Sequence, residues 1–404
     1  MLKKIKSRDV QLGMYVHEVC GSWMDNPFWK KSFKLINDKD LRAIKDYNIK
    51  EIWIDTDRGL DVANEAPVVT DEEEKNHINT AMHEIATQHK IHKPRVPVKE
   101  ELVRARKVVT DAKKDIIVMF NDARMGKAVN MDQASNLVDD INQSISRNSD
   151  ALLSLVRLKN ANNYTYMHSI AVSGLMMALG KELGLDSDTI QEVGMAGLMH
   201  DIGKLYIPSK ILNKVGRLTD AEFVIMKSHP FQGWELLKNT SDVTEITLDV
   251  CLHHHERVDG EGYPDRLSGN DLSLYARMGA VCDVYDAITS TRCYKASWEP
   301  AESLRKMVEW KEGQFDDTVF SAFVKAIGVY PTGTLVKLKT GRLALVVEQT
   351  KSSLLKPIVK VFFSTNSMVH IMPELLDLSL SPDSIIGKED PLHWGLDLTK
   401  ISDL

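Results

Sequence analysis

Apolar residues recur at the spacing of α-helices over most of the chain from residue 100 to residue 328. The first predicted helix carries an apolar stripe at Val103, Val108, Ala112, Ile116 and Met119. A break at Met125–Lys127 separates this helix from the next one. From residue 159 onward, the loop Val258–Leu272 is the main interruption of the helical period. The pattern predicts a mainly α-helical protein.

Both ends of the chain carry β-strand patterns instead. Near the N-terminus, Ile52-Trp53-Ile54 predicts a buried strand, and Asn37-Asp38 opens a short predicted helix before it. Near the C-terminus, apolar runs at residues 335–338 and 343–347 flank a turn with a glycine, which predicts a hairpin. We therefore expect a small N-terminal α+β module and a short C-terminal β segment around an all-helical domain.

These changes of pattern divide the chain into four predicted parts. A stretch that is first acidic and then rich in histidine and lysine is typical of a linker. The parts are a regulatory or sensory α+β module over residues 1–65, a linker and helical connector over 66–147, an all-helical domain over 148–330 and a β-rich segment over 331–404. The connector is expected to pack against a neighbouring domain, and a homodimer through it is a second hypothesis.

Composition and charge exclude several classes of protein. With 43% apolar and 27% charged residues, the 404-residue chain has the composition of a soluble globular protein. A formal net charge of −6 argues against binding of bulk nucleic acid through a basic surface. The four cysteines form no Cys-x-x-Cys pair, which fits a reducing compartment. No apolar run has the length of a membrane span or the form of a signal peptide, so we expect a cytoplasmic protein.

Histidines and aspartates are concentrated in the helical domain, where six of the thirteen histidines lie between residues 168 and 255. His168, His200 and Asp283 each fall on the apolar face of a predicted helix. A single buried histidine is usually a hydrogen-bonded core residue. Burying about seven polar groups without partners would cost roughly 1–3 kcal/mol each, which a shared metal ion removes. Imidazole and carboxylate ligands suit divalent iron, manganese or zinc, so the pattern favours a metal-dependent hydrolase.

Seven other histidines are interpreted as solvated or peripheral. His253 is expected to point away from the pair that follows it, either beside the site or on the surface. Two groups lack a matched set of carboxylates and are expected in solvent. They are His77, His83, His89 and His92 in the linker, and His370 and His393 in the β-rich segment.

A series of motifs extends the His-Asp pattern over about residues 150–330. They are Tyr166-Met167-His168-Ser169, His200-Asp201-Ile202-Gly203-Lys204, Met226-Lys227-Ser228-His229-Pro230, His254-His255-Glu256-Arg257, Gly260-Glu261-Gly262-Tyr263-Pro264, Asp283-Val284-Tyr285-Asp286-Ala287 and the run from Thr289 to Lys295. Together they resemble the HD-GYP family of cyclic di-GMP phosphodiesterases, part of the HD hydrolase superfamily. The resemblance implies hydrolysis of cyclic di-GMP to linear pGpG and/or GMP, which lowers this bacterial second messenger.

The resemblance also implies a ligand set for two divalent metal ions. One ion is expected on His168, His200, Asp201 and Asp283, and Asp201 is expected to bridge to a second ion on His229, His254 and His255. Some relatives hold a third ion at positions that are Tyr164 and Ser209 here, and this difference favours a binuclear site. Iron or manganese is expected first, with zinc, nickel and magnesium as alternatives.

Substrate contacts are implied in the same way. Asp201 and Lys204 are the expected catalytic residues, and Lys204 either stabilises the phosphate or protonates the leaving 3′ oxygen. Arg292 and Lys295 are expected to hold a phosphate, where a solvated helix end is the plainer alternative. Gly262, Tyr263 and Pro264 are expected to border the substrate and to contact partner proteins such as GGDEF-type signalling proteins, with Tyr263 either stacked on guanine or structural.

Two other functions compete with this prediction. The first is a hydrolase of another cyclic dinucleotide, such as cyclic GMP-AMP, because the motifs do not select the base. The second is a receptor that binds cyclic di-GMP without catalysis, which a degenerate ligand set would favour. The ligand set of this chain is intact, so the enzyme is the preferred hypothesis.

Overall fold

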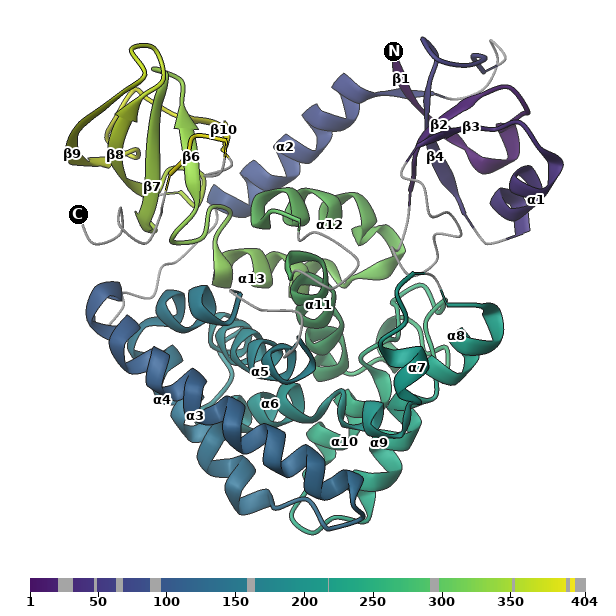
Figure 1. Cartoon of the computed structure of the whole chain (residues 1–404), viewed down its shortest axis with the longest axis vertical. Coiled ribbons are helices and arrows are strands. Elements are labelled where there is room, and N and C mark those ends of the chain that lie inside the picture. The colour runs from purple at the N-terminus through teal and green to yellow at the C-terminus, as the bar shows by residue number, and fades with distance from the viewer. Residues whose placement is uncertain are drawn as a thin grey trace. The chain divides into compact units, whose positions relative to one another are not determined.

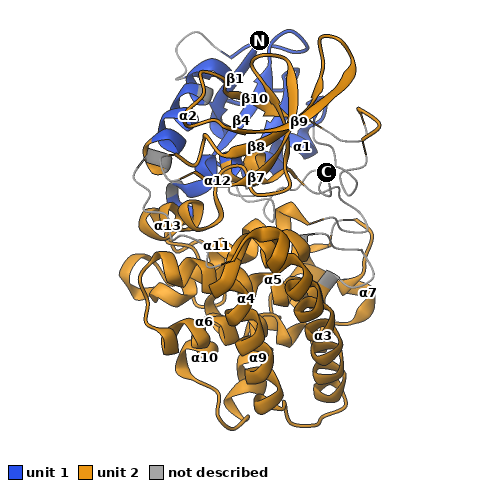
Figure 2. Ribbon diagram, turned by 90° about the vertical axis from the view of Figure 1, so that its left-hand side faces the viewer, with its two compact units in different colours: residues 1–83, 305–314 blue, residues 84–304, 315–404 orange. Residues whose placement is uncertain are grey.

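A computed structural model describes residues 1–20, 32–46, 49–62, 68–87, 96–157, 164–216, 218–290, 298–350, 353–389 and 393–396 (Figure 1). The chain divides into two compact units, which Figure 2 colours separately. Unit 1 contains Met1–His83 and Arg305–Gln314, and unit 2 contains Glu84–Leu304 and Phe315–Leu404. Over these described ranges, no helix is both long and apolar enough to cross a membrane.

Unit 1 is built on a five-stranded antiparallel sheet with the strand order β3-β2-β4-β1-β5. Its elements are β1 (Leu2–Lys6), β2 (Tyr15–Val19), β3 (Phe33–Lys34), α1 (Asp38–Asp46), β4 (Glu51–Asp55), β5 (Val69–Thr70) and the start of α2 (Asp71–Thr87). The central strand β4 contributes Ile52 and Ile54 to a core that also contains Ile44 of α1. The expected α+β module is therefore confirmed. The last ten residues of α12 (Pro300–Gln314) also belong to this unit.

The helices of unit 2 form the larger part of the molecule. They are α3 (Val98–Arg124), α4 (Met131–Arg157), α5 (Tyr164–Glu182), α6 (Ser187–Met199), α7 (Ser209–Leu212), α8 (Asp220–Met226), α9 (His229–Lys238), α10 (Glu245–His253), α11 (Leu274–Thr289) and α13 (Asp317–Ile327), with 3-10 turns η3 (Ile202–Tyr206) and η4 (Gly269–Asp271). Helix α5 is buried almost throughout, and α4, α6, α11 and α13 pack around it. This arrangement confirms the mainly α-helical fold.

The connector helices α3 and α4 are separated at the predicted break, where Gly126 has a φ of +80°. The predicted apolar stripe of α3 is partly wrong, because Val103 is 74% exposed. The fully buried residue in that turn is Glu101, whose carboxylate accepts hydrogen bonds from Ser144 and Arg147 of α4. Helix α4 kinks at Asn148, where the backbone is extended.

The C-terminal part of unit 2 is a second five-stranded antiparallel sheet with the order β10-β6-β7-β8-β9. Its strands are β6 (Leu335–Leu338), β7 (Arg342–Glu348), β8 (Ile358–Ser364), β9 (Val369–Asp377) and β10 (Ile385–Lys388). The predicted hairpin is present as β6 and β7, and Gly341 at its turn has a φ of +77°. The β-rich C-terminal segment is therefore confirmed.

Candidate metal centre

Seven side chains from five segments of unit 2 converge at one place. His168 lies in α5, His200 and Asp201 follow α6, His229 begins α9, His254 and His255 follow α10, and Asp283 lies in α11. Six of them are buried and His255 is nearly so. Three groups of atoms lie close enough together to hold a metal ion, and these groups include all seven residues. The structure thus brings together the complete set of expected ligands.

The two carboxylate oxygens of Asp201 face different histidines. Its Oδ2 atom lies 3.4 Å from Nε2 of His168 and 3.4 Å from Nε2 of His200. Its Oδ1 atom lies 3.2 Å from Nε2 of His229 and 3.8 Å from Nε2 of His254. Atoms bound to one ion at about 2.1 Å lie roughly 3–4 Å apart, so each side of the carboxylate has the spacing of a ligand set.

Asp283 completes both sides of the arrangement. Its Oδ1 atom lies 3.0 Å from Nε2 of His168 and 3.9 Å from Nε2 of His200. Its Oδ2 atom lies 3.8 Å from Nδ1 of His255. Two carboxylates therefore lie between two groups of imidazoles.

Four of the histidines are oriented by a hydrogen bond at the other ring nitrogen. The Nδ1 atom lies 2.6 Å from Asp286 Oδ2 in His168, 2.8 Å from the Gly197 carbonyl oxygen in His200 and 2.8 Å from the Met226 carbonyl oxygen in His229. In His254 it lies 3.0 Å from the carbonyl oxygens of Val250 and Cys251. Because these acceptors hold a proton on Nδ1, Nε2 is the nitrogen left for a metal ion, and it is the atom that faces the centre.

Glycines allow the segments that carry these residues to approach closely. A Cβ atom on Gly197 would lie 2.8 Å from the Cα atom of Ser173, so α5 and α6 touch through their backbones and bring His168 beside His200. A Cβ atom on Gly203 would lie 1.9 Å from the carbonyl oxygen of His229. The contact between η3 and α9 therefore requires glycine, and it brings His229 to Asp201.

Burial and charge prepare these groups for a cation. Burial lowers the pKa of His229 and His254, and it lowers the pKa of His255 to about 3, so these rings are neutral at pH 7. Burial opposes ionisation of Asp201, but Lys204 and His200 outweigh it and hold the pKa of that carboxyl well below its usual range. Burial also opposes the charge on His168, yet its aspartate partners raise the pKa of that ring to about 10, so a metal ion that binds there must displace the proton on Nε2.

One buried atom of this cluster has no hydrogen-bond partner. Asp201 Oδ1 is fully buried and accepts no hydrogen bond from any residue that the structure describes. Leaving an ionised oxygen in this state costs more than the roughly 1–3 kcal/mol of a neutral group, and coordination to a cation removes the penalty. Together with neutral imidazoles whose lone pairs face it, this oxygen fits a site for divalent metal ions.

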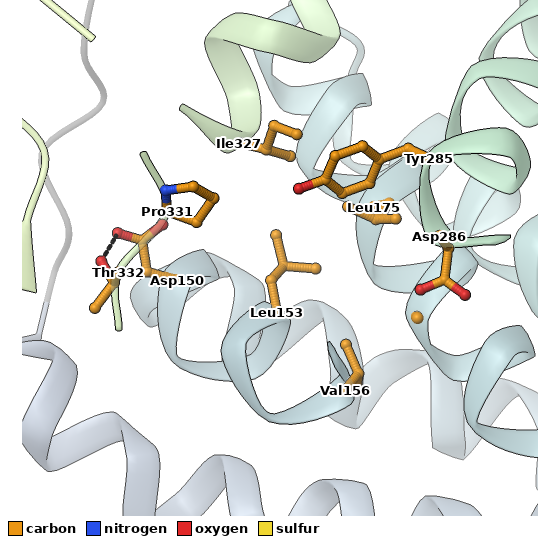
Figure 3. Close-up of a pocket in the computed structure, with 10 residues that line it drawn as sticks. Asp150, Leu153, Val156, Leu175, Tyr285, Asp286, Ile327, Pro331 and Thr332 are labelled. Carbon is orange, nitrogen blue, oxygen red and sulfur yellow. Dashed lines mark hydrogen bonds between the residues drawn. The ribbon is translucent and has the colours of Figure 1, made fainter. Parts of the chain in front are cut away.

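Asp286, for which the sequence predicted no role, holds His168 in place. Its Oδ2 atom accepts the hydrogen bond from His168 Nδ1. The carboxylate also borders a cavity lined by apolar residues of α4, α5 and α13, in which none of the seven converging side chains takes part (Figure 3). Asp286 therefore lies behind His168 and not among the atoms that face the centre. Its spacing of three residues from Asp283, on one face of a buried helix, was the available signal.

Replacing Asp286 with alanine is expected to weaken metal binding by about 10- to 100-fold, because the His168 ring loses the acceptor that orients it. The Asp286→Asn variant, which keeps a neutral acceptor, should bind metal more tightly than Asp286→Ala. Titration of the metal-free protein with Mn²⁺ measures both effects. The matched control is Asp265→Asn, since Asp265 bonds to the ring of His253, which faces away from the centre. Equal affinity in Asp286→Ala and the parent protein would contradict this role.

Some of the other expected site residues lie next to the cluster, and two lie outside the described residues. Lys204 lies at the rim of the cluster with its Nζ atom 2.5 Å from Asp201 Oδ2, because the chain leaves the α-helix after Met199 and turns through η3. The Tyr263 ring stacks on His255 with centroids 4.7 Å apart. Gly262 has no room for a Cβ atom, which would lie 2.4 Å from the Cα atom of Glu256. Arg292 and Lys295 lie outside the described residues.

The histidines that were expected elsewhere are not part of the cluster. His253 bonds to Asp249 at 2.7 Å and to Asp265 at 3.1 Å. His77, His83 and His370 are exposed. His89 and His92 lie outside the part of the chain that the structure describes.

Comparisons with known proteins agree with this geometry. Residues 134–319 match the family described as HD domain, and residues 2–134 match a domain of unknown function, DUF3391. The fold and the site therefore define a hydrolase of the HD-domain class. Cyclic di-GMP phosphodiesterase PA4108 of Pseudomonas aeruginosa is 48% identical over 397 residues, which cover 98% of this chain and 94% of the relative. The chain belongs to the HD-GYP family of cyclic di-GMP phosphodiesterases.

Two further relatives match over a smaller part of the chain. The cyclic di-GMP phosphodiesterase response regulator RpfG of Xanthomonas campestris is 38% identical over 155 residues, which cover 38% of this chain and 40% of the relative. The 3′3′-cGAMP-specific phosphodiesterase 1 of Vibrio cholerae is 35% identical over 163 residues, which cover 40% of this chain and 38% of the relative. Relatives whose names give different dinucleotide substrates thus each match part of this chain.

Proposed function

We propose that this chain hydrolyses cyclic di-GMP at a binuclear centre of divalent metal ions, to linear pGpG and/or GMP. The observation that carries the proposal is the division of the two Asp201 oxygens between two groups of histidines. The 48% identity to a cyclic di-GMP phosphodiesterase over nearly the whole chain supports the substrate. Hydrolysis would lower the second messenger in the cytoplasm of a bacterium.

Seven residues would hold the two ions. His168, His200, Asp201 and Asp283 form the first group, and His229, His254, His255 and Asp201 form the second. When bound, such ions supply activation of a water molecule and neutralisation of charge on the phosphate. Iron or manganese suits this mixture of imidazole and carboxylate ligands best, with zinc, nickel or magnesium as alternatives.

The other residues would bind and orient the substrate. Lys204 lies at the edge of the cluster, where its ammonium group can stabilise the phosphate or give a proton to the leaving 3′ oxygen. Tyr263, with Gly262 and Pro264, would border the substrate and offer a surface to GGDEF-type or other signalling proteins. Arg292 and Lys295, which follow α11 in the chain, would hold a phosphate through charge-assisted hydrogen bonds.

Removal of the metal is the first test of this proposal. Protein purified without oxygen is expected to contain about two ions per chain and to cleave cyclic di-GMP. Chelation should abolish cleavage, and either Fe²⁺ or Mn²⁺ should restore it. Elemental analysis and chromatography of the products measure both results.

The choice of substrate is tested by assaying cyclic GMP-AMP beside cyclic di-GMP. The name of the Vibrio relative gives cyclic GMP-AMP as its substrate. If the protein cleaved cyclic GMP-AMP faster than cyclic di-GMP, the mixed dinucleotide would be its preferred substrate. Tight binding of cyclic di-GMP by a metal-loaded protein that cleaves neither compound would indicate a receptor.

A further inference from the structure

A lysine near the metal centre has no ion-pair partner within the described ranges. Lys227 follows the last residue of α8 and precedes His229 by two positions. Its Nζ atom lies 4.9 Å from the centre of the Phe223 ring and 5.8 Å from that of Tyr263. The side chain is half-buried. An ammonium group that faces two aromatic rings and no carboxylate is available to bind an anion.

Two contacts made by neighbours of Lys227 place it close to the part of the centre that Asp201 Oδ1 faces. The ring of Tyr263 stacks on His255, with an interplanar angle of 27°. The carbonyl oxygen of Met226, the residue before Lys227, accepts the hydrogen bond from His229 Nδ1 at 2.8 Å. Lys227 is therefore anchored next to His229 by its backbone and next to His255 through Tyr263.

The surroundings of Lys227 differ from those of Lys204. Lys204 is paired with Asp201 Oδ2, on the side of His168 and His200. A cyclic dinucleotide carries two phosphate groups, and a centre that cleaves one of them leaves the other anionic. A cation outside the metal centre can hold that second phosphate, because charge-assisted hydrogen bonds are the strong contacts to phosphate.

We propose that Lys227 binds the phosphate of the cyclic dinucleotide that is not being cleaved. This role rests on the proposed function, since it requires a substrate with two phosphates. Lys227 is then a substrate-binding residue that fixes the position of the ring, and it touches neither the ions nor the reacting phosphate. Its contribution should appear in binding of the dinucleotide and be absent for a diester with one phosphate.

The test uses Lys227→Met, which keeps an apolar side chain against Phe223 and Tyr263 and removes the charge. Lys227→Arg restores a cation. The matched control is Lys238→Met, because Lys238 also lies over an aromatic ring, 4.4 Å from the centre of Trp234. It is exposed and follows His229 by nine residues of α9, about 13 Å along the helix. Each protein is assayed with cyclic di-GMP and with bis(para-nitrophenyl) phosphate, and its metal content is measured.

Lys227→Met is expected to raise KM for cyclic di-GMP by about 10- to 100-fold, the effect of one lost charge-assisted contact. Its KM for the small diester and its metal content should equal those of the parent protein, and arginine should recover much of the loss. Lys238→Met should match the parent on both substrates.

Three results would overturn the role. Equal losses on both substrates, or loss of metal, would indicate that Lys227 supports the aromatic rings and the centre. Unchanged kinetics on both substrates would indicate a cation that only covers the two rings. A parent protein that cleaves the small diester and not cyclic di-GMP would contradict the proposed substrate itself, and this role with it.

Discussion

Asp201→Asn is expected to lose both metal ions and to reduce kcat for cyclic di-GMP on the order of a thousandfold or more. Asparagine has one carbonyl oxygen and an amide nitrogen that donates hydrogen bonds, so it cannot present an anionic oxygen to each group of histidines. Each group is built around one Asp201 oxygen, at 3.4 Å on one side and 3.2 Å on the other. Loss of metal activation removes several kcal/mol of stabilisation from the transition state.

Elemental analysis and product chromatography measure this result, and circular dichroism checks that the variant is folded. His253→Ala is the control, because His253 is adjacent to the ligands in sequence while its ring bonds to Asp249 and Asp265. The control should keep about two ions per chain and near-normal turnover. An Asp201→Asn protein with two tightly bound ions would refute the bridging role, whatever its activity.

The burial of some proposed ligands was predictable because each interrupts a local apolar pattern. His168 and Asp283 were placed on apolar faces of predicted helices, and both are buried in helices that pack against each other. A polar residue in the middle of an apolar face can be recognised in the sequence as a candidate site residue, since its burial requires a partner. The division of Asp201 between two groups of histidines came from the family resemblance instead, because it depends on contacts between distant segments.

Residues whose role depends on a distant partner were missed. Glu101 is fully buried, and its partners Ser144 and Arg147 lie more than forty positions away. From the sequence of α3 alone, Val103 is a better candidate for the core than Glu101. In the structure, however, Val103 is exposed. Asp286 and His168 are likewise separated by 118 positions. Periodicity reports which face of a helix is apolar, but it does not report which charges the neighbouring helix supplies.

The sequence could not predict the compact units of the structure, because they depend on contacts between segments that are distant in the chain. The boundaries near residues 65, 148 and 331 follow local changes of pattern, whereas the compact units are defined by packing. The segment Arg305–Gln314 belongs with the N-terminal unit although it lies more than two hundred residues away in the chain. A helical period that continues smoothly through α12 contains no signal of this assignment.

The close contact between η3 and α9 leads to the second large effect. Gly203→Ala is expected to lower the stability of the fold by about 3 kcal/mol, at the upper end for overpacking. The added Cβ atom would lie 1.9 Å from the His229 carbonyl oxygen and 2.5 Å from the Gly233 nitrogen. Both atoms belong to the backbone, so no side chain can rotate to make room. The segments must move apart, and His229 must move away from Asp201.

This displacement distinguishes Gly203→Ala from Asp201→Asn. His168, His200 and Asp283 do not depend on the contact with α9, so the variant should retain about one ion per chain and lose the ion on the His229 side. Thermal unfolding and elemental analysis measure the two effects. Gly387→Ala is the matched control, since a Cβ atom at Gly387 would meet no heavy atom within 4 Å. A Gly203→Ala protein with an unchanged Tm and two bound ions would mean that α9 can shift without displacing His229, and that the glycine is not needed to assemble the centre.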